Sequence, residues 1–357
     1  MNISLAPLEG ITTYIFRNAL CRYYGGVDSF YTPFLTASHL KGRELRDVCP
    51  ENNTGLNIIP QILTNDAELF FTIARQLQAI GYNEVNLNAG CPSGTVVSKG
   101  RGAGLLDEPS QLDRLLDEIF EKCKDLENMK ISVKTRIGLD TLNQWEDILA
   151  VYNRYPLSQL IIHPRMREEF YKGKVHFDAF EEAVQMYGMG SGLEKQNTVL
   201  CYNGDITDSS SFEDVIERWK KAEKIEVSEE EKYSCEGKVI VEEVDSSVEN
   251  DSDMKMCDYH VMIGRGLVAC PELASNLQEG NDCDGHIRDK RKFKEFITEI
   301  MEGYLEEMSH EKQVVMKMKE LWSYWATGLN LDKKQLKEIH KVSRLADYKN
   351  VVDMIWT

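Results

Sequence analysis

The first 270 residues alternate short apolar runs rich in β-branched residues with longer amphipathic stretches. Eight of the apolar runs have strand length, and helical patterns lie between most of them. We expect strands at 3–8, 29–34, 58–63, 84–89, 131–136, 160–164, 199–203 and 259–263, with clear helices at 67–80, 111–124, 145–154 and 211–221. Strands that alternate with helices predict a parallel sheet, and eight such units predict an α/β fold closed into a (β/α)8 TIM barrel.

The pattern changes after about residue 287, where no further strand is expected. Segments 292–308, 314–329 and 332–355 all show helical periodicity, which predicts a small C-terminal helical bundle. Asp332 is a candidate N-cap for the third helix. We therefore expect a barrel over residues 1–280 and a helical domain over 287–357.

Composition places the chain among ordinary globular proteins of the cytosol. Of its 357 residues 42% are hydrophobic, yet no stretch approaches the roughly 18 consecutive apolar residues of a membrane span. The N-terminus lacks the pattern of a secretory signal. Nine cysteines are scattered singly without a Cys-x-x-Cys pair, which argues against a disulfide framework or a structural zinc site. We expect a cytoplasmic protein without a metal, whose thiols are mostly small core residues.

The net charge of −17 argues against a generally basic nucleic-acid binder, but the charge is uneven. Residues 223–258 hold thirteen acidic and four basic residues, whereas 286–357 hold twelve and fourteen. We interpret 223–258 as an acidic insertion before the last strand, partly disordered or with a small hairpin around 238–241. The whole-chain charge is therefore a poor guide to any single face.

Polar residues gather at the ends of the predicted strands, where barrel enzymes carry their chemistry. They are Glu9, Gln61, Asn88, Cys91, Lys134, Arg136, His163, Arg165, Asn203, Asp205 and Arg265. Turn formation explains a few of these residues, but it does not explain so regular a placement.

The segment NLNAGCPSGTVVSKGRGAGLL, residues 86–106, runs from a strand into a glycine-rich loop with one cysteine. Glycines let a backbone approach a ligand closely, and the proline after Cys91 restricts the local chain. Neither feature is specific alone. Together they make Cys91 a candidate acid or nucleophile.

The chain resembles the tRNA-dihydrouridine synthases. The loop carries their Asn-x-x-Cys-Pro core followed by a glycine-rich, basic stretch. Further motifs follow in the family's order: LAPLEGIT (5–12), PQIL (60–63), SVKTRIG (132–138), IIHPR (161–165) with YKG (171–173), YNGDI (202–206), VMIGRG (261–266) and KMKELWSYW (317–325).

The resemblance implies an FMN cofactor at the barrel mouth. Ala6 and Pro7 would pack near the ring, the Gln61 amide would meet its polar edge, and Lys134 would place positive charge near N1. The phosphate would lie at the ends of strands seven and eight. The implied cofactor-binding residues are Ala6, Pro7, Gln61, Lys134, His163, Asn203, Gly204, Asp205, Gly264 and Arg265.

The reaction implied is reduction of the C5–C6 bond of a uracil in tRNA. Hydride would reach C6, and a neutral Cys91 thiol would protonate C5 as general acid. NADPH would reduce the flavin at the same mouth, and the base would be extruded from the tRNA to reach it. Candidate substrate contacts are Asn88, Lys99, Arg101, Arg136 and Arg165, with tail cations such as Lys290 to Lys294 and Lys333 to Arg344 on the tRNA backbone.

Two features depart from the family. Pro164 and Met166 flank Arg165 where Gly-Arg-Thr is usual, which puts the contacts of that loop in question. The acidic insertion has no assigned counterpart, and we expect it to project away from the mouth.

Alternatives stay open. One is an FMN-dependent barrel oxidoreductase for a small molecule, similar to dihydroorotate dehydrogenases or ene-reductases. Another is a non-catalytic RNA-binding barrel. A monomer is expected for an enzyme that embraces a tRNA.

Overall fold

The computed structural model describes residues 1–188, 197–230 and 259–356. Its strands pair in parallel throughout a single sheet in the order β3-β2-β1-β9-β8-β7-β6-β5-β4. They are β1 (Asn2–Leu5), β2 (Ser29–Tyr31), β3 (Ile58–Ile59), β4 (Gln61–Ile62), β5 (Glu84–Ala89), β6 (Lys130–Arg136), β7 (Gln159–His163), β8 (Val199–Tyr202) and β9 (His260–Ile263).

The sheet closes through the segment predicted as the third strand. Pro60 divides that segment into β3, which pairs with β2, and β4, which pairs with β5. Proline has no N–H for a strand ladder, but its carbonyl still accepts the Asn86 N–H at 2.9 Å. Because β3 and β4 are two pieces of one strand, the two ends of the strand order given above meet. The eight predicted strands therefore form a closed barrel, which confirms the predicted fold.

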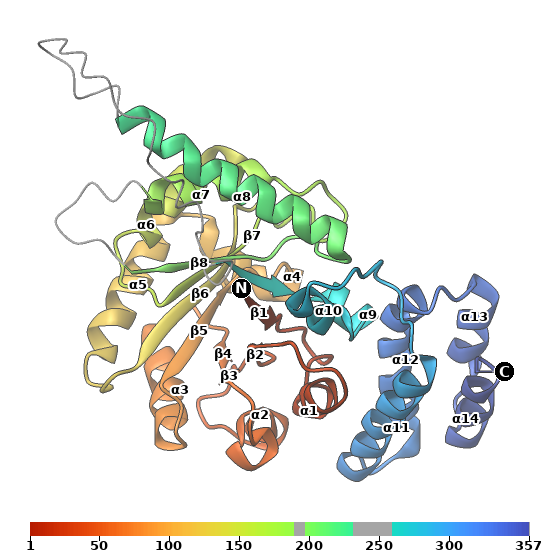
Figure 1. The fold of residues 1–357 in the computed structure, drawn as a ribbon. Coiled ribbons are helices and arrows are strands. Elements are labelled where there is room, and N and C mark those ends of the chain that lie inside the picture. The colour runs from red at the N-terminus through yellow and green to blue at the C-terminus, as the bar shows by residue number, and fades with distance from the viewer. Residues whose placement is uncertain (189–196, 231–258, 357) are drawn as a thin grey trace, which may run out of the picture.

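The helices cover the outside of the barrel, as Figure 1 shows for α3, α5, α6, α7 and α8. Their buried faces are apolar: α5, for example, turns Leu112, Leu115, Leu116 and Ile119 inward. Around the barrel lie α1 (Tyr14–Tyr23), α2 (Gly42–Val48), η1 (Pro50–Asn53), α3 (Ala67–Ala79), α4 (Gly94–Val97), η2 (Gly102–Leu106), α5 (Pro109–Cys123), η3 (Leu142–Gln144), α6 (Trp145–Tyr152), α7 (Phe177–Gly188), α8 (Ser209–Glu230), α9 (Arg265–Ala269) and α10 (Leu273–Glu279).

Helix α8 is longer than the sequence predicted. It continues past Lys221 to Glu230, so the first eight residues of the predicted acidic insertion belong to this helix. The remainder of the insertion, with the predicted hairpin and its direction relative to the mouth, lies outside the described residues.

The C-terminal helices α11 (Lys290–Glu307), α12 (Glu311–Gly328), α13 (Lys333–Lys341) and α14 (Leu345–Asp353) lie together at one side of the barrel (Figure 1). The third predicted helix is thus two helices, since the chain is extended at Val342 and Arg344. Asp332 caps α13 in a capping box with Gln335, as expected.

The C-terminal helices pack directly on the barrel. Phe296 of α11 makes edge-on contacts with Phe16 of α1 and with Tyr24, the residue that ends that helix. Gly328 of α12 lies so close to α9 that a Cβ there would come within 2.0 Å of the Ala269 carbonyl oxygen. Only glycine permits this approach, and it brings α12 beside the ends of β8 and β9.

In the part of the chain that the structure describes, no helix is both long and apolar enough to cross a bilayer. Seven cysteines are free thiols, of which Cys123, Cys201, Cys270 and Cys283 are buried as expected of core residues. The other two cysteines fall outside the described ranges.

Candidate functional site

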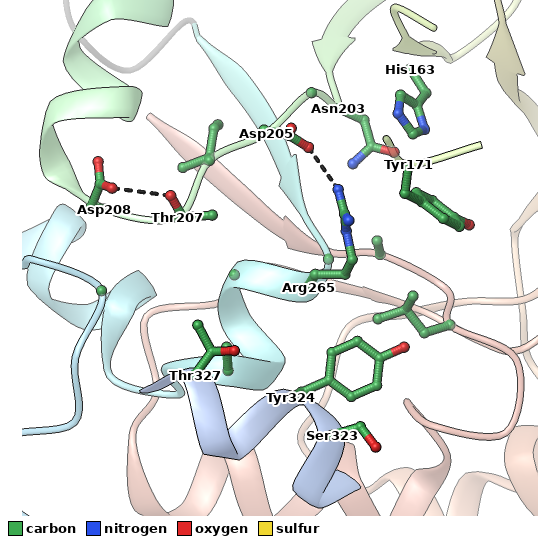
Figure 2. Close-up of a pocket in the computed structure, with 18 of the residues that line it drawn as sticks. His163, Tyr171, Asn203, Asp205, Thr207, Asp208, Arg265, Ser323, Tyr324 and Thr327 are labelled. Atoms are coloured by element: carbon green, nitrogen blue, oxygen red, sulfur yellow. Dashed lines mark hydrogen bonds and ion pairs between the residues drawn. The ribbon is translucent and has the colours of Figure 1, made fainter. Parts of the chain in front are cut away.

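A cavity of about 600 Å³ opens at the C-terminal ends of the strands. It extends from the barrel axis to the segment 284–286 and to helix α12, which contributes Tyr324 and Thr327 (Figure 2). Nine of the ten predicted cofactor-binding residues line it: Ala6, Pro7, Lys134, His163, Asn203, Gly204, Asp205, Gly264 and Arg265. Residues from five strand ends, far apart in the sequence, are therefore collected around one space.

Strand register sets the order of these groups. Asn88 of β5 lies beside Lys134 of β6, and Arg136 of β6 lies beside His163 of β7. Neighbouring parallel strands end at the same edge, so a residue's position along its strand decides its depth in the mouth.

Cys91 is held by its own loop. The Oδ1 atom of Asn88 accepts the backbone N–H groups of Gly90 at 3.1 Å and Cys91 at 2.9 Å. Gly102 packs on Cys91 with φ of +57°, and a Cβ there would lie 2.8 Å from the Cys91 carbonyl oxygen. Burial raises the pKa of the Cys91 thiol above its ordinary value, so the thiol is neutral at neutral pH.

Gln61 is the one predicted cofactor residue that does not line the cavity. Its side chain is fully buried, its Nε2 donates to Asn86 at 2.8 Å, and its Oε1 accepts from Asn88 at 2.7 Å. Asn86 in turn donates to Ser132 at 3.0 Å. This chain of polar side chains links the adjacent strands β4, β5 and β6 and ends at the loop of Cys91.

Lys134 and His163 carry the main electrostatic features of the cavity floor. Burial, aided by the charge of Arg136, lowers the pKa of Lys134 to about 8. Burial also lowers the pKa of His163 well below its ordinary range, and the cations Arg136, Lys134, Arg165 and Arg265 add to that effect. The histidine is therefore neutral, and its Nε2 lies 3.4 Å from Nη1 of Arg165.

Asp205 joins two arginines at the wall of the cavity. It accepts two hydrogen bonds from Arg165, at 2.9 and 2.7 Å. It also accepts one from Arg265 at 2.8 Å, which Figure 2 shows. Burial alone would raise the pKa of Asp205, but the hydrogen bonds and charges of both arginines outweigh it and lower that pKa. Arg265 also lies 4.8 Å from the ring centroid of Tyr171.

The five predicted substrate contacts do not line the cavity, and three of them, Asn88, Arg136 and Arg165, have buried side chains with internal partners. Arg165 is held by Asp205 and by the Gly173 carbonyl. Arg136 is 1% exposed and donates to the carbonyl oxygens of Gly90, Met166 and Phe170 at 3.0, 2.9 and 2.9 Å. These contacts favour a positioning role for both arginines.

Lys99 and Arg101 lie on the turn between α4 and η2, near Asn65. The Lys99 carbonyl accepts from Asn65 at 3.0 Å, and Arg101 Nε donates to the same residue at 3.2 Å. Lys99 is exposed and Arg101 half-buried. Their contact with RNA stays a prediction.

Several side chains around the mouth had no role predicted from the sequence. Tyr171 and Tyr324 line the cavity, and Phe170 and Arg167 lie on the loop beside the Cys91 segment. Tyr171 was visible in the YKG motif and Tyr324 in KMKELWSYW, but aromatic residues in such motifs are also typical of a core. Arg167 offered no such signal.

The family model and the curated relatives that match this chain point to one family. A family model described as dihydrouridine synthase matches residues 4–221. A probable tRNA-dihydrouridine synthase of Staphylococcus aureus (strain COL) is 28% identical over 219 residues, 60% of this chain and 64% of that protein. The probable tRNA-dihydrouridine synthase 2 of Bacillus subtilis (strain 168) is 27% identical over 208 residues, which cover 57% and 61%. Each match thus spans less than two thirds of the relative.

Among solved structures, morphinone reductase is similar with a TM-score of 0.48 and 10% identity. The match covers 82% of this chain and 88% of that enzyme.

Proposed function

The chain belongs to the dihydrouridine synthase family, and we propose that it reduces the C5–C6 bond of specific uridines in tRNA to 5,6-dihydrouridine. The observation that carries this proposal is that the Cys91 loop and Lys134 stand at the ends of neighbouring strands, because Asn88 of β5 pairs with Lys134 of β6. The Cys91 thiol there is neutral, and Lys134 lines the cavity. A neutral thiol can act as a general acid, and a buried ammonium can stabilise a neighbouring group that gains negative charge.

FMN is the proposed cofactor, with NADPH as the reductant. A volume of about 600 Å³ falls within the roughly 300–1,000 Å³ typical of cofactor sites. Ala6, Pro7 and Leu8 give the cavity an apolar side for a planar ring, while Lys134 and Arg265 give it positive charge. When bound, FMN would supply the hydride that reaches C6 of the uracil.

The residues of this chain would stabilise charge, donate the proton and bind the phosphate. Lys134 would stabilise negative charge at the ring, and Cys91 would donate its proton to C5. Arg265, with the backbone of Asn203, Gly204 and Gly264, would hold the phosphate. His163 is neutral, and therefore adds no charge to the floor.

The RNA substrate is supported by family membership and by the activity for which the two bacterial relatives are named. A uracil within folded tRNA is stacked, so the enzyme must extrude it to place C5 near Cys91. The C-terminal helices beside the mouth are the proposed tRNA-binding domain. A cytoplasmic monomer, as expected from the sequence, completes the proposal.

The test measures electron transfer from NADPH through the flavin to tRNA. The purified protein is reduced with NADPH under anaerobic conditions and mixed with unmodified tRNA, and flavin absorbance and dihydrouridine are measured. Reoxidation by tRNA with dihydrouridine formed supports the proposal. A yellow protein indifferent to tRNA would indicate a small-molecule oxidoreductase, and a protein that stays colourless with added FMN would refute the flavin assignment.

Two cysteine variants distinguish a loss of proton transfer from a general loss of folding. Cys91→Ala should reduce its flavin with NADPH normally but lose most of the reoxidation by tRNA. Cys21→Ala, which removes an exposed thiol on α1, should behave as the native protein.

A further inference from the structure

The loop that follows β7 presents two exposed aromatic side chains at the barrel mouth. Phe170 and Tyr171 are each 43% exposed, whereas most large apolar side chains of the described chain are buried. Tyr171 lines the cavity, but Phe170 does not. Phe170 therefore has an exposed ring next to the site without being part of its wall.

The backbone of Phe170 is strained. Its φ is +49°, in the left-handed region that bulky residues avoid. The other non-glycine residues of the described chain with positive φ are Asn128 and Asn330, and asparagine tolerates this conformation. A strained phenylalanine persists only where its surroundings enforce it, and such residues cluster at functional sites.

Arg136 binds the backbone of Phe170. Its buried guanidinium donates to the Phe170 carbonyl at 2.9 Å, and also to Gly90 beside Cys91 at 3.0 Å. The Phe170 N–H closes a turn by donating to the Arg167 carbonyl at 3.1 Å. The position of the Phe170 ring is therefore tied to the loop that carries Cys91.

Arg167 completes the surface on the same side. Its Nε donates to the carbonyl of Pro92, the residue after Cys91, at 3.3 Å. Its guanidinium carbon lies 5.6 Å from the centroid of the Phe170 ring. The guanidinium thus lies over one face of the Phe170 ring, next to the loop of the proposed proton donor.

We propose that Phe170 and Arg167 form a stacking platform for the nucleotide next to the reduced uridine, an inference that rests on the proposed function. A uracil extruded toward Cys91 stays covalently joined to its neighbours, so an adjacent base passes this surface. Aromatic rings and arginine planes are the groups on which proteins stack unpaired RNA bases. The platform would replace the stacking that the neighbouring base loses on extrusion.

Two substitutions test the ring without disturbing the loop. Phe170→Asn removes the aromatic face but suits the left-handed backbone, and Phe170→Trp keeps an aromatic face. Phe120→Leu is the control, because it removes a ring of α5 that stacks on Tyr155, which lies just before β7 at the end of the barrel opposite the mouth. All three should reduce their flavin with NADPH at the native rate.

The tRNA measurements separate the variants. We expect Phe170→Asn to weaken tRNA binding and lower kcat/KM by roughly tenfold or more, the size of one lost base–aromatic stack. Phe170→Trp and Phe120→Leu should stay within about twofold of the native protein. Removal of the base next to the target uridine should make Phe170→Asn and the native protein equal.

A spectroscopic signal reports the stack directly. With 2-aminopurine next to the target uridine, its fluorescence should be quenched by the native protein and by Phe170→Trp, but not by Phe170→Asn. Native-like affinity and quenching in Phe170→Asn would refute the platform while leaving dihydrouridine formation intact. A native protein that converts no tRNA would instead refute the proposed function, and the platform with it.

Discussion

Asn88 and Cys91 are joined by a hydrogen bond of 2.9 Å from the cysteine backbone N–H to the asparagine Oδ1. The other end of the Asn88 amide donates to Gln61 inside the barrel at 2.7 Å. The position of the candidate acid is thus linked to buried amides of β4 and β5, and does not depend on its glycine-rich loop alone. Asn88 and Gln61 therefore hold the Cys91 loop in place, whereas Cys91 itself would touch the substrate.

Substitution of Asn88 should impair the proton-transfer step. Asn88→Ala leaves two N–H groups and the Gln61 amide without these partners, so Cys91 shifts from its productive position. A misplacement of about 1 Å costs roughly a hundredfold in rate. We expect kcat for dihydrouridine formation to fall by this order, while NADPH-dependent flavin reduction changes less than twofold.

Asn88→Asp is the informative companion, because its carboxylate still accepts both N–H groups but no longer donates to Gln61. It should recover part of the lost rate. Equal losses in both the NADPH and tRNA half-reactions would argue against a role specific to Cys91.

The pH dependence of reoxidation by tRNA should show a late alkaline limb. A general acid works only while protonated, and burial raises the pKa of the Cys91 thiol. Ionisation of Cys91 should therefore lower the rate only above the ordinary thiol pKa of about 8.5, whereas loss of the Lys134 proton would lower it from about pH 8. Stopped-flow absorbance over a pH series checks this, and an ionisation retained in Cys91→Ala would belong to another group.

Lys134 should reduce the stability of the flavin-free protein. Its pKa of about 8 in the folded chain, against about 10.4 in the unfolded chain, corresponds to a cost of roughly 3 kcal/mol when the lysine is charged. Lys134→Met should raise the free energy of unfolding by up to about that amount at pH 7.

The cost of the charged Lys134 to stability depends on pH. Below pH 8 the lysine is charged in both states and the full cost applies; as pH rises from 8 to about 10, the unfolded chain alone keeps the proton and the cost disappears. Urea unfolding at pH 7 and pH 10 should show the advantage of Lys134→Met shrink. A constant advantage would indicate better packing instead of relieved burial of charge.

Arg136→Lys should be strongly destabilising. A lysine ammonium cannot reproduce the planar fork that reaches three carbonyl oxygens at once, so at least one buried acceptor is left without its donor. We expect a loss of about 3 kcal/mol by chemical denaturation. Arg154→Lys, at an exposed ion pair with Asp113, should change stability by less than about 0.5 kcal/mol.

The sequence alone determined the elements and their order. Alternating apolar runs and amphipathic stretches are local properties, and they were sufficient to predict eight parallel strands and a helical C-terminus. The clustering of polar residues at strand ends was predictable too, because the ends of parallel strands share one edge. Nine of the predicted cofactor residues consequently line one cavity.

The tertiary structure decided what those polar groups bind. Gln61 and Arg136 stand at strand ends like Lys134, yet their polar atoms are used inside the protein by Asn86, Asn88 and three loop carbonyls. Such partners lie tens of residues away and meet only through strand register and loop path, which local patterns do not encode. The left-handed backbone of Phe170 has the same origin, because the residue's own preference opposes it and a distant arginine binds its carbonyl oxygen.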